Sequence, residues 1–367
     1  MTLSEGKVKK IFENSDEKID AIIIKNSSEP LIDTNFFYAT ELTKGLFEGC
    51  AAVLFPDGRV NLIVSQLEAE SAEESSMDVF VYKTGKEYKE LLKNLLEGSS
   101  KIGLNFASIS HKSFTDFKNF LSDKNFIDVS NAILKSRAIK DENEINLILK
   151  ALEIAEKVME KIPEIIHSNM KEFELAAEIN YLMQKHGADK PAFDTISSFG
   201  ANSSQPHYTQ GNTSLKSGDF VLCDFGACYN KYNSDITRTF VYKEASEKQK
   251  KMHEVVLNAQ KIAFEKIRPG ITGREVHIAV EEYINNTEFA GKFIHGTGHS
   301  LGMDVHDGYV GLNSLSDMEL VENMVLTVEP GVYIPGFGGV RIEDDVLVTS
   351  DGCRILSKTT RELIQIS

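Results

Sequence analysis

The sequence predicts two domains: an N-terminal α/β domain at 1–135, then at 136–367 an α+β domain whose helices pack on a mostly antiparallel sheet. The chain has 367 residues, which exceeds the roughly 250–300 residues that a single hydrophobic core usually organises. Up to about residue 135, short strand-like runs alternate with helical runs. Beyond that point, longer amphipathic helices are combined with pairs of strand-like runs, which indicates a different layer architecture.

The first domain is predicted from its alternation of short elements. Strands are expected where apolar and β-branched residues run together, at 19–26, 50–65, 77–84, 101–106 and 125–130. Helices are expected at 88–98 and 111–123, where apolar residues recur at helical spacing. The Pro-Asp-Gly sequence at 56–58 predicts a hairpin turn inside the second strand-like run. This part of the sequence carries no recognisable catalytic constellation.

The helices of the second domain are marked by capping residues. Asp141 and Glu144 form a capping box that begins a helix, and the apolar spacing continues to Pro163. Three more helices are predicted at 171–187, 246–267 and 272–286. Strands are expected at 193–200, 219–229, 235–243, 323–334, 339–350 and 353–358.

Composition limits the classes of function that the chain can have. It is 41% hydrophobic and 26% charged, which is typical of a globular protein. Its net charge of −15 argues against nucleic acid or an anionic membrane as a main partner, because both attract basic surfaces. The four cysteines show no CxxC spacing, and neither a secretory signal nor an 18-residue apolar run is visible. We therefore expect a cytoplasmic protein with reduced cysteines.

Two aspartates interrupt neighbouring apolar runs of the second domain. A buried, unpaired carboxylate costs of order several kcal/mol. Asp224 must therefore be protonated, paired with a base, placed at a turn or bound to a cation. Taken alone, the Asp-Phe-Gly sequence favours a turn that closes the strand. However, the short connection to the next run allows a hairpin that brings Asp224 and Asp235 to the same point.

Further candidate ligands follow toward the C-terminus. Glu329 and Glu343 each interrupt an apolar strand-like run, and histidines lie among glycines at 295–307. Each residue alone is better explained as a satisfied core histidine, an edge-strand glutamate or part of a solvated charge run. Together, four carboxylates and one histidine would carry four negative charges into one core, which two divalent cations would neutralise. This donor set suits Mn²⁺, or Co²⁺, Fe²⁺ and Zn²⁺ with less preference, and two ions ~3.5–4 Å apart can share a hydroxide nucleophile.

Four stretches of the second domain resemble the successive signatures of a known enzyme family. They are 206–240, "HGTGHSLGMDVHD" at 295–307, "LTVEPGVY" at 326–333 and "GGVRIEDDVLV" at 338–348. In order, spacing and residue type they resemble the pita-bread metallopeptidases, in the branch of Xaa-Pro dipeptidases (prolidases) and Xaa-Pro aminopeptidases. The resemblance covers about 140–363. It implies a pita-bread catalytic domain, with a curved antiparallel sheet flanked by helices, after a creatinase-like N-terminal α/β domain.

The resemblance also implies a metal-binding set for two divalent metal ions per subunit, Mn²⁺ or Co²⁺ favoured and Zn²⁺ or Fe²⁺ possible. The implied ligands are Asp224, Asp235, His299, Glu329 and Glu343. In this set Asp235 and Glu343 would bridge both ions, and Glu329 would also carry a proton from the nucleophilic water to the leaving amine.

Other residues are matched to substrate binding. The resemblance places His207 near the scissile bond, and it implies that His295 and His306 contact substrate and stabilise the tetrahedral intermediate. Arg341 matches an arginine that donates hydrogen bonds near the metal site, and Tyr333 fills the corresponding aromatic position.

The sequence departs from the family pattern at two positions in these stretches. Lys231 stands where a glycine is usual, and Asp307 stands where many relatives have glutamate. Neither matches a metal ligand, so the departures bear on substrate preference rather than on the chemistry.

The predicted activity is hydrolysis of Xaa-Pro bonds by a dinuclear-metal peptidase that uses a metal-bridging hydroxide, with dipeptides favoured. Proline has no N–H and a fixed φ, so peptidases that need that donor fail on it. An Xaa-Pro aminopeptidase acting on longer peptides is the alternative. A non-catalytic pita-bread binding protein is disfavoured because all the implied ligands are present. We expect small peptides with proline at the second position as substrates, no nucleic-acid or membrane partner, and a homodimer.

Overall fold

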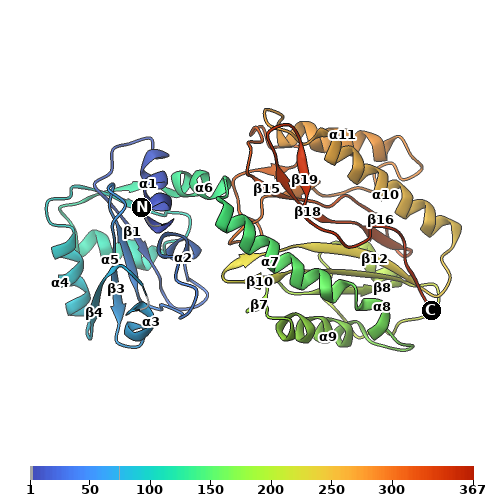
Figure 1. Ribbon diagram of the computed structural model, residues 1–367, viewed down its shortest axis with the longest axis horizontal. Coiled ribbons are helices and arrows are strands. Elements are labelled where there is room, and N and C mark those ends of the chain that lie inside the picture. The colour runs from blue at the N-terminus through green and yellow to red at the C-terminus, as the bar shows by residue number, and fades with distance from the viewer. Residues whose placement is uncertain (1–2, 74) are drawn as a thin grey trace. The chain divides into compact units, whose positions relative to one another are not determined.

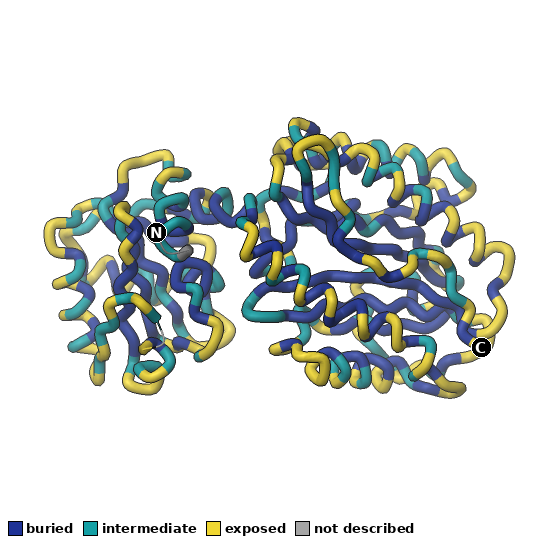
Figure 2. The backbone as a smooth tube through the Cα atoms, in the orientation of Figure 1, coloured by how far each residue is buried: buried dark blue, intermediate teal, exposed yellow. Residues whose placement is uncertain are grey.

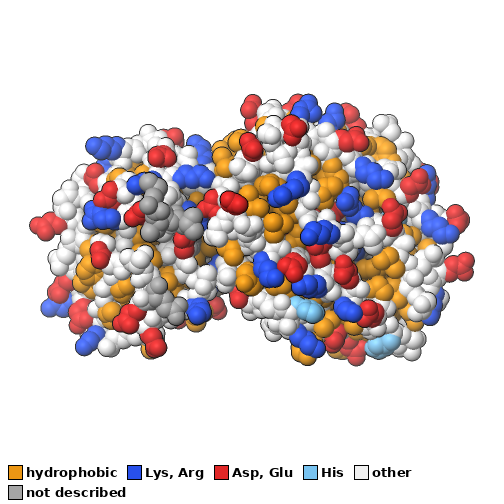
Figure 3. Space-filling view, viewed as in Figure 1, with side chains coloured by type: hydrophobic (Ala, Val, Ile, Leu, Met, Phe, Trp, Pro, Cys, Tyr) orange, Lys and Arg blue, Asp and Glu red, His pale blue; other side chains and the backbone are white. Residues whose placement is uncertain are grey.

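The computed structural model describes residues 3–73 and 75–367, and the chain separates into two compact units, Met1–Arg137 and Ala138–Ser367 (Figure 1). The sequence-based domain boundary at 135/136 stays a prediction. Within the described residues, no helix is both long and apolar enough to cross a membrane. Figure 3 shows that basic and acidic side chains are interspersed over the face in view.

The first unit is built on a mixed sheet whose strands run in the order β4-β3-β2-β1-β5-β6. The strands are β1 Ala21–Lys25, β2 Ala51–Leu54, β3 Val60–Ser65, β4 Asp78–Tyr82, β5 Lys101–Leu104 and β6 Asn125–Asp128. Neighbours β1–β2 and β2–β3 are antiparallel and the remaining pairs are parallel. The predicted hairpin turn lies between β2 and β3, where Gly58 has a φ of +95°.

Helices of this unit were only partly predicted. They are α1 Leu3–Glu13, α2 Thr34–Thr40, α3 Ala69–Glu73, α4 Gly85–Leu95, α5 His111–Phe120 and α6 Ser130–Ala138. The expected α4 and α5 are present, whereas α1, α2, α3 and α6 had no counterpart in the sequence-based prediction. In α2 every residue from Asn35 to Thr40 is buried, so the sequence shows no polar face that would mark a helix.

The second unit places helices on both sides of paired strands, as Figure 1 shows. The helices are α7 Glu142–Met159, α8 Ile162–Ile165, α9 Glu172–Lys185, α10 Glu247–Lys266 and α11 Gly273–Asn285. Side chains of α7–α9 share a hydrophobic cluster with β9 and β12, and those of α10 and α11 share another with β15–β18. Figure 2 shows these strands as the buried layer between helices whose outer faces are exposed.

The strands of this unit form several small sheets rather than one. They are β7 Lys190–Pro191, β8 Ile196–Phe199, β9 Phe220–Phe225, β10 Ala227–Tyr229, β11 Tyr232–Asn233, β12 Ile236–Tyr242, β13 Gly298–His299, β14 Gly311–Leu312, β15 Val325–Val328, β16 Gly331–Ile334, β17 Gly338–Arg341, β18 Asp344–Val348, β19 Cys353–Ile355 and β20 Gln365–Ile366. The sheet orders are β20-β12-β9-β8, β15-β18-β19, β11-β10-β7, β16-β17 and β13-β14. Apart from the parallel pair β12–β20, the strand pairs of this unit are antiparallel.

Several predicted elements are corrected by the structure. The helix expected to run from Asp141 to Pro163 ends at Met159, and a separate turn, α8, has the proline near its start, where the missing N–H does no harm. The run 219–229 is two strands, because β9 ends at Phe225 and β10 then pairs with β7. At the break, a side chain on Gly226 would lie 1.8 Å from the Ser234 carbonyl oxygen, so only glycine fits.

The position of this break shows whether Asp224 lies in a strand or in a turn. Asp224 lies inside β9, paired with Thr237 of β12, so the interpretation of Asp-Phe-Gly as a turn that closes the strand is wrong. The reversal of the chain occurs later, at Asn230 and Lys231, whose φ values of 47° and 71° are both left-handed. Two successive left-handed residues between paired strands are typical of a type I′ hairpin.

Candidate metal centre

All the predicted catalytic and metal-binding residues line one cavity of about 390 Å³ in the second unit. They are Asp224, Asp235, His299, Glu329, Glu343, His207, His295, His306 and Arg341. The predicted aromatic residue, Tyr333, does not line the cavity but contacts two residues that do.

Strand pairing explains how the two aspartates meet. Asp224 of β9 is paired with Thr237 of β12, so their side chains lie on the same face of the sheet. Asp235 directly precedes β12 and is two residues before Thr237, which gives it the same side of the chain. The antiparallel register therefore places both carboxylates together although each interrupts a different apolar run.

The two glutamates lie in breaks between strands, not within strands as the sequence suggested. Glu329 and Pro330 separate β15 from β16, and Ile342 and Glu343 separate β17 from β18. The strands on either side of each break have different partners, because β15 pairs with β18 whereas β16 pairs with β17. Each glutamate thus marks the point where the chain leaves one sheet for another.

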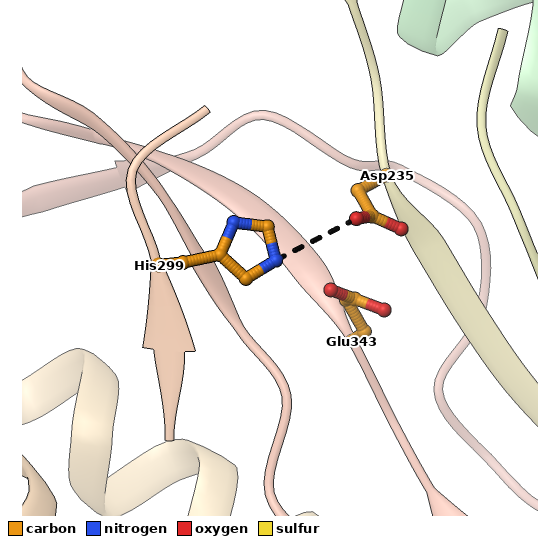
Figure 4. A group of neighbouring side chains, drawn as sticks. All are labelled: Asp235, His299 and Glu343. Carbon is orange, nitrogen blue, oxygen red and sulfur yellow. Dashed lines mark ion pairs between the residues drawn. The ribbon is translucent and has the colours of Figure 1, made fainter. Parts of the chain in front are cut away.

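His299 presents one ring nitrogen to the carboxylates. Its Nδ1–H donates to the Ser300 carbonyl at 3.1 Å, which leaves the Nε2 lone pair unprotonated in the neutral ring. Nε2 lies 3.7 Å from Asp235 Oδ2 and 3.6 Å from Glu329 Oε1. Figure 4 shows the ring extending from β13 toward Asp235 and Glu343, and these three residues offer ligand atoms within 4.8 Å of one another.

Burial disfavours the charged form of three of the cavity carboxylates. It raises the pKa of Asp235 and of Glu343 well above the usual value, and the neighbouring carboxylates raise both further. Burial also raises the pKa of Glu329 to about 7, although Arg341 opposes the shift. The cause in each case is the cost of a negative charge that is neither solvated nor paired.

Two carboxylate oxygens in the cavity lack the donors that buried oxygens normally have. Asp224 Oδ1 and Asp235 Oδ1 are buried without a hydrogen-bond partner among the residues that the structure describes. Such orphaned acceptors are rare in folded proteins. Oxygen-rich ligation with one imidazole fits divalent cations such as Mn²⁺, and the observed donor set therefore fits metal ions.

The Arg341 guanidinium contacts this group of cavity carboxylates. Its Nη2 donates to Asp224 Oδ2, its Nε donates to Thr237 Oγ1 at 3.1 Å, and its Nη1 donates to the Tyr333 hydroxyl at 2.9 Å. Thr237 in turn donates to Glu343 Oε2 at 2.6 Å. One positive charge cannot balance four ionised carboxylates, so all four would stay ionised together only if further cations were bound.

Both ring nitrogens of His295 form hydrogen bonds with neighbouring residues. Its Nδ1–H donates to the Gly296 carbonyl at 2.7 Å, and its Nε2 accepts from the Tyr333 hydroxyl at 2.8 Å. Burial and the nearby Arg341 lower the pKa of His295 to about 3, so the ring stays neutral. The predicted contact of His295 with substrate would therefore require exchange of the Tyr333 hydrogen bond.

His207 and His306 differ from His295 because both are exposed. The His306 ring lies 4.3 Å from the His299 ring, centroid to centroid, so it flanks the carboxylate group. Both histidines line the cavity.

Sequence reasoning missed residues that support the ligands. Thr237 bonds both Glu343 and Arg341, and its place two residues after Asp235 on one strand was the signal that could have found it. Asp345 accepts from the Asp235 backbone N–H at 3.2 Å. Because Glu343, Asp344 and Asp345 are all buried, the alternative that this acidic run is solvated is wrong.

Buried carboxylates short of donors, one imidazole with a free lone pair and exposed histidines around a cavity define a metal-dependent hydrolase. The chain belongs to metallopeptidase family M24, whose model matches residues 146–350. The creatinase/prolidase N-terminal domain matches residues 7–139. The predicted family and the predicted two-domain fold with a pita-bread domain are confirmed, and membership implies divalent metal ions.

Similar proteins extend over nearly the whole chain. The Xaa-Pro dipeptidase of Pyrococcus furiosus is 39% identical over 348 residues, which are 93% of this chain and 98% of that protein. The crystal structure of the prolidase from Pyrococcus horikoshii superposes with a TM-score of 0.88 at 39% identity, covering 98% of this chain and all of that one. An X-Pro aminopeptidase from Thermotoga maritima gives a TM-score of 0.89 at 32% identity, covering 95% of this chain and 98% of that one.

Proposed function

We propose that this protein is an Xaa-Pro dipeptidase that uses two divalent cations, Mn²⁺ or Co²⁺ in preference to Zn²⁺ or Fe²⁺. The observation that carries the proposal is the convergence of every implied ligand and substrate-contacting residue on one cavity. The near full-length similarity to an Xaa-Pro dipeptidase supports the choice of substrate. A cytoplasmic, homodimeric enzyme is proposed with it, and light scattering of the purified protein tests the dimer.

The cations would be held by Asp224, Asp235, His299, Glu329 and Glu343. Bound there, they would supply Lewis-acid polarisation of the peptide carbonyl and a water that loses its proton near neutral pH. The Glu329 carboxylate would take up a proton from that water and return it to the leaving amine. His207 and His306, both exposed at the cavity, can donate hydrogen bonds to the peptide as charge develops on its carbonyl oxygen.

The walls of the cavity suit a proline ring. Phe193, Ile196, Pro206 and Val305 line it beside the carboxylates, and they offer apolar contact to a residue without an N–H. A general peptidase would place an acceptor for that N–H here, which a prolyl bond leaves unpaired.

Dipeptidase and aminopeptidase differ in how they treat the carboxylate next to proline. Among the described residues that line the cavity, Arg341 is the only lysine or arginine, and it is bound to Asp224. A dipeptide's carboxylate therefore needs a cation from outside this set, and a second subunit of the proposed homodimer is our candidate source. The similarity to an X-Pro aminopeptidase favours the second candidate function, cleavage of longer Xaa-Pro peptides.

The deciding experiment measures kcat/KM for Leu-Pro, Leu-Pro-amide and Leu-Pro-Ala with Mn²⁺-loaded and Co²⁺-loaded enzyme. We expect the dipeptide to be preferred and amidation to remove most of the advantage, because an unpaired receptor for the carboxylate is costly. Equal or faster cleavage of Leu-Pro-Ala would assign the protein to the aminopeptidases. Absence of cleavage of all three peptides would refute the Xaa-Pro assignment itself.

A further inference from the structure

The loop between β8 and β9 carries His207 to the cavity. Its first part is a 3₁₀ turn at Gly200–Ser204, and a second turn follows, in which the Tyr208 N–H donates to the Gln205 carbonyl at 3.2 Å. His207 is exposed, and its ring makes no hydrogen bond within residues 3–73 and 75–367. The position of His207 therefore depends on how the turn around it is held.

Glu172 binds this loop on both sides of His207. It is the first residue of α9 and is completely buried. Oε1 accepts from the Phe199 N–H at 2.8 Å and from Asn202 Nδ2 at 2.9 Å. Oε2 accepts from the Tyr208 hydroxyl at 2.8 Å and from the Gly211 N–H at 3.2 Å. No lysine or arginine forms an ion pair with Glu172 in the described part of the chain, so the loop itself supplies the donors that a buried carboxylate requires.

Tyr208 links this carboxylate to the neighbouring His207. Burial raises the pKa of the Tyr208 phenol, so the hydroxyl keeps its proton and keeps donating to Glu172. The same oxygen accepts from Asn202 Nδ2 at 2.9 Å. A Cβ on Gly211 would lie 2.7 Å from that hydroxyl and 3.3 Å from Glu172 Oε2, so a larger residue there would displace the Tyr208 hydroxyl from its present position.

We propose that Glu172 and Tyr208 are positioning residues that hold the His207 turn at the cavity. Neither lines the cavity, so they act through His207 and not on substrate or metal. This inference rests on the proposed function, in which His207 contacts the substrate near the scissile bond. The carboxylate fixes the turn in one place before substrate binds, which preserves an orientation that would otherwise be lost to loop motion.

The test begins with Tyr208→Phe, which removes the hydroxyl and keeps the ring. We expect kcat for Leu-Pro to fall about tenfold with little change in KM and with the metal content unchanged. Glu172→Gln replaces one accepting oxygen with an NH₂ group, which would face the donors of the loop without being able to accept from them. This variant should therefore lower kcat further than Tyr208→Phe does. Tyr181→Phe is the matched control, because Tyr181 lies on α9 but is 56% exposed, and it should leave kcat unaltered.

A double-mutant cycle separates positioning from a general structural role. In a His207→Ala background, Tyr208→Phe should cause no further loss of kcat, because the residue through which it acts is gone. An additive loss, with Tyr208→Phe lowering kcat equally in both backgrounds, would overturn the proposal and leave the proposed function intact.

A second measurement does not depend on activity. Amide hydrogen exchange in the metal-loaded Tyr208→Phe enzyme should become faster across 199–213 and stay unchanged in β9. Unchanged exchange in 199–213 would overturn the proposal whatever the kinetics. If the wild type failed to cleave any Xaa-Pro peptide, the proposed function would fall, and localised exchange would still establish the anchoring of the loop.

Discussion

Two groups of buried carboxylates in the second unit have opposite surroundings. Glu156 accepts from the Lys358 N–H, from the Thr359 N–H at 2.7 Å and from the Thr359 hydroxyl at 3.1 Å. Glu172 accepts two donors on each oxygen, and Asp344 pairs with Arg238 at 2.7 Å. We call these three the framework carboxylates.

The cavity carboxylates are Asp224, Asp235, Glu329 and Glu343. They crowd one another and share one guanidinium, and an oxygen of Asp224 and another of Asp235 have no donor among the described residues. Burial alone therefore does not mark a functional carboxylate, since three of the four cavity carboxylates are buried, as the framework carboxylates are. The supply of donors separates the two groups: the framework carboxylates receive hydrogen bonds or ion pairs from the protein, whereas Asp224, Asp235 and the adjacent Asp345 each have an oxygen without a donor among the described residues.

Removal of metal should have the largest effect. Exhaustive chelation is expected to abolish Leu-Pro hydrolysis, and Mn²⁺ or Co²⁺ should restore it better than Mg²⁺, because the donor set includes an imidazole. Elemental analysis before and after chelation provides the measurement. Full activity in metal-free protein would contradict the distinction between the two groups of carboxylates.

The same substitution in the two groups should have different consequences. Glu329→Gln should lower kcat by about 10²–10⁴-fold, because it removes the proton carrier and a ligand charge. Glu156→Gln should leave kcat within about twofold and lower the free energy of unfolding by about 1 kcal/mol, because the three donors to Oε1 would then meet a neutral amide oxygen in place of a charged one. Steady-state kinetics and urea unfolding of both variants test this contrast. Near wild-type kcat in Glu329→Gln with two metals bound would show that the proton carrier is another residue.

In the metal-free protein, the cavity carboxylates should contribute more to the free energy of unfolding at low pH, where they are protonated. The folded-state pKa of Glu329 is raised from 4.5 to about 7, so between these values the folded state binds more protons than the unfolded state. The contribution to stability is complete below about pH 4.5 and is lost as the pH rises toward 7, by about 2–3 kcal/mol. Asp235 and Glu343, whose pKa values are also raised, act in the same direction.

Calorimetry of chelated and Mn²⁺-loaded protein from pH 5 to 8 measures this dependence. The increase in Tm caused by Mn²⁺ should grow with pH, because cations replace the protons that the carboxylates lose. A constant increase over this range would show that the cavity carboxylates do not release protons when metal binds.

The smallest effect concerns the hairpin between Asp224 and Asp235. Lys231 has a φ of 71°, a left-handed conformation that costs a non-glycine residue roughly 1 kcal/mol. Lys231→Gly should therefore stabilise the protein by up to about 1 kcal/mol without changing kcat. Lys261→Gly, in the middle of α10 and exposed, should destabilise it by about 1 kcal/mol. A change of kcat in Lys231→Gly would show that this hairpin contributes to the site.

Local signals predicted much of the second unit. The helices expected at 171–187, 246–267 and 272–286 are observed as α9, α10 and α11, and Ser246 and Thr272 form capping boxes with the residues three positions later. In the first unit, short buried helices such as α2 and α6 were missed, because their stability comes from packing and not from a periodic polar face.

The sequence by itself predicted the candidate ligands, because each carboxylate interrupts an apolar run and a charge there requires compensation, and it predicted the class of enzyme through its resemblance to a known family. Only the tertiary structure decided how each charge is compensated. The donor to Glu343 is Thr237, which lies 106 residues away, and the donors to Glu172 come from a loop between two strands. The donors that a buried carboxylate receives come from segments far apart in the chain. Glu172 and Glu329 are therefore equivalent as letters of the sequence, and only folding makes one a structural anchor and the other a candidate metal ligand.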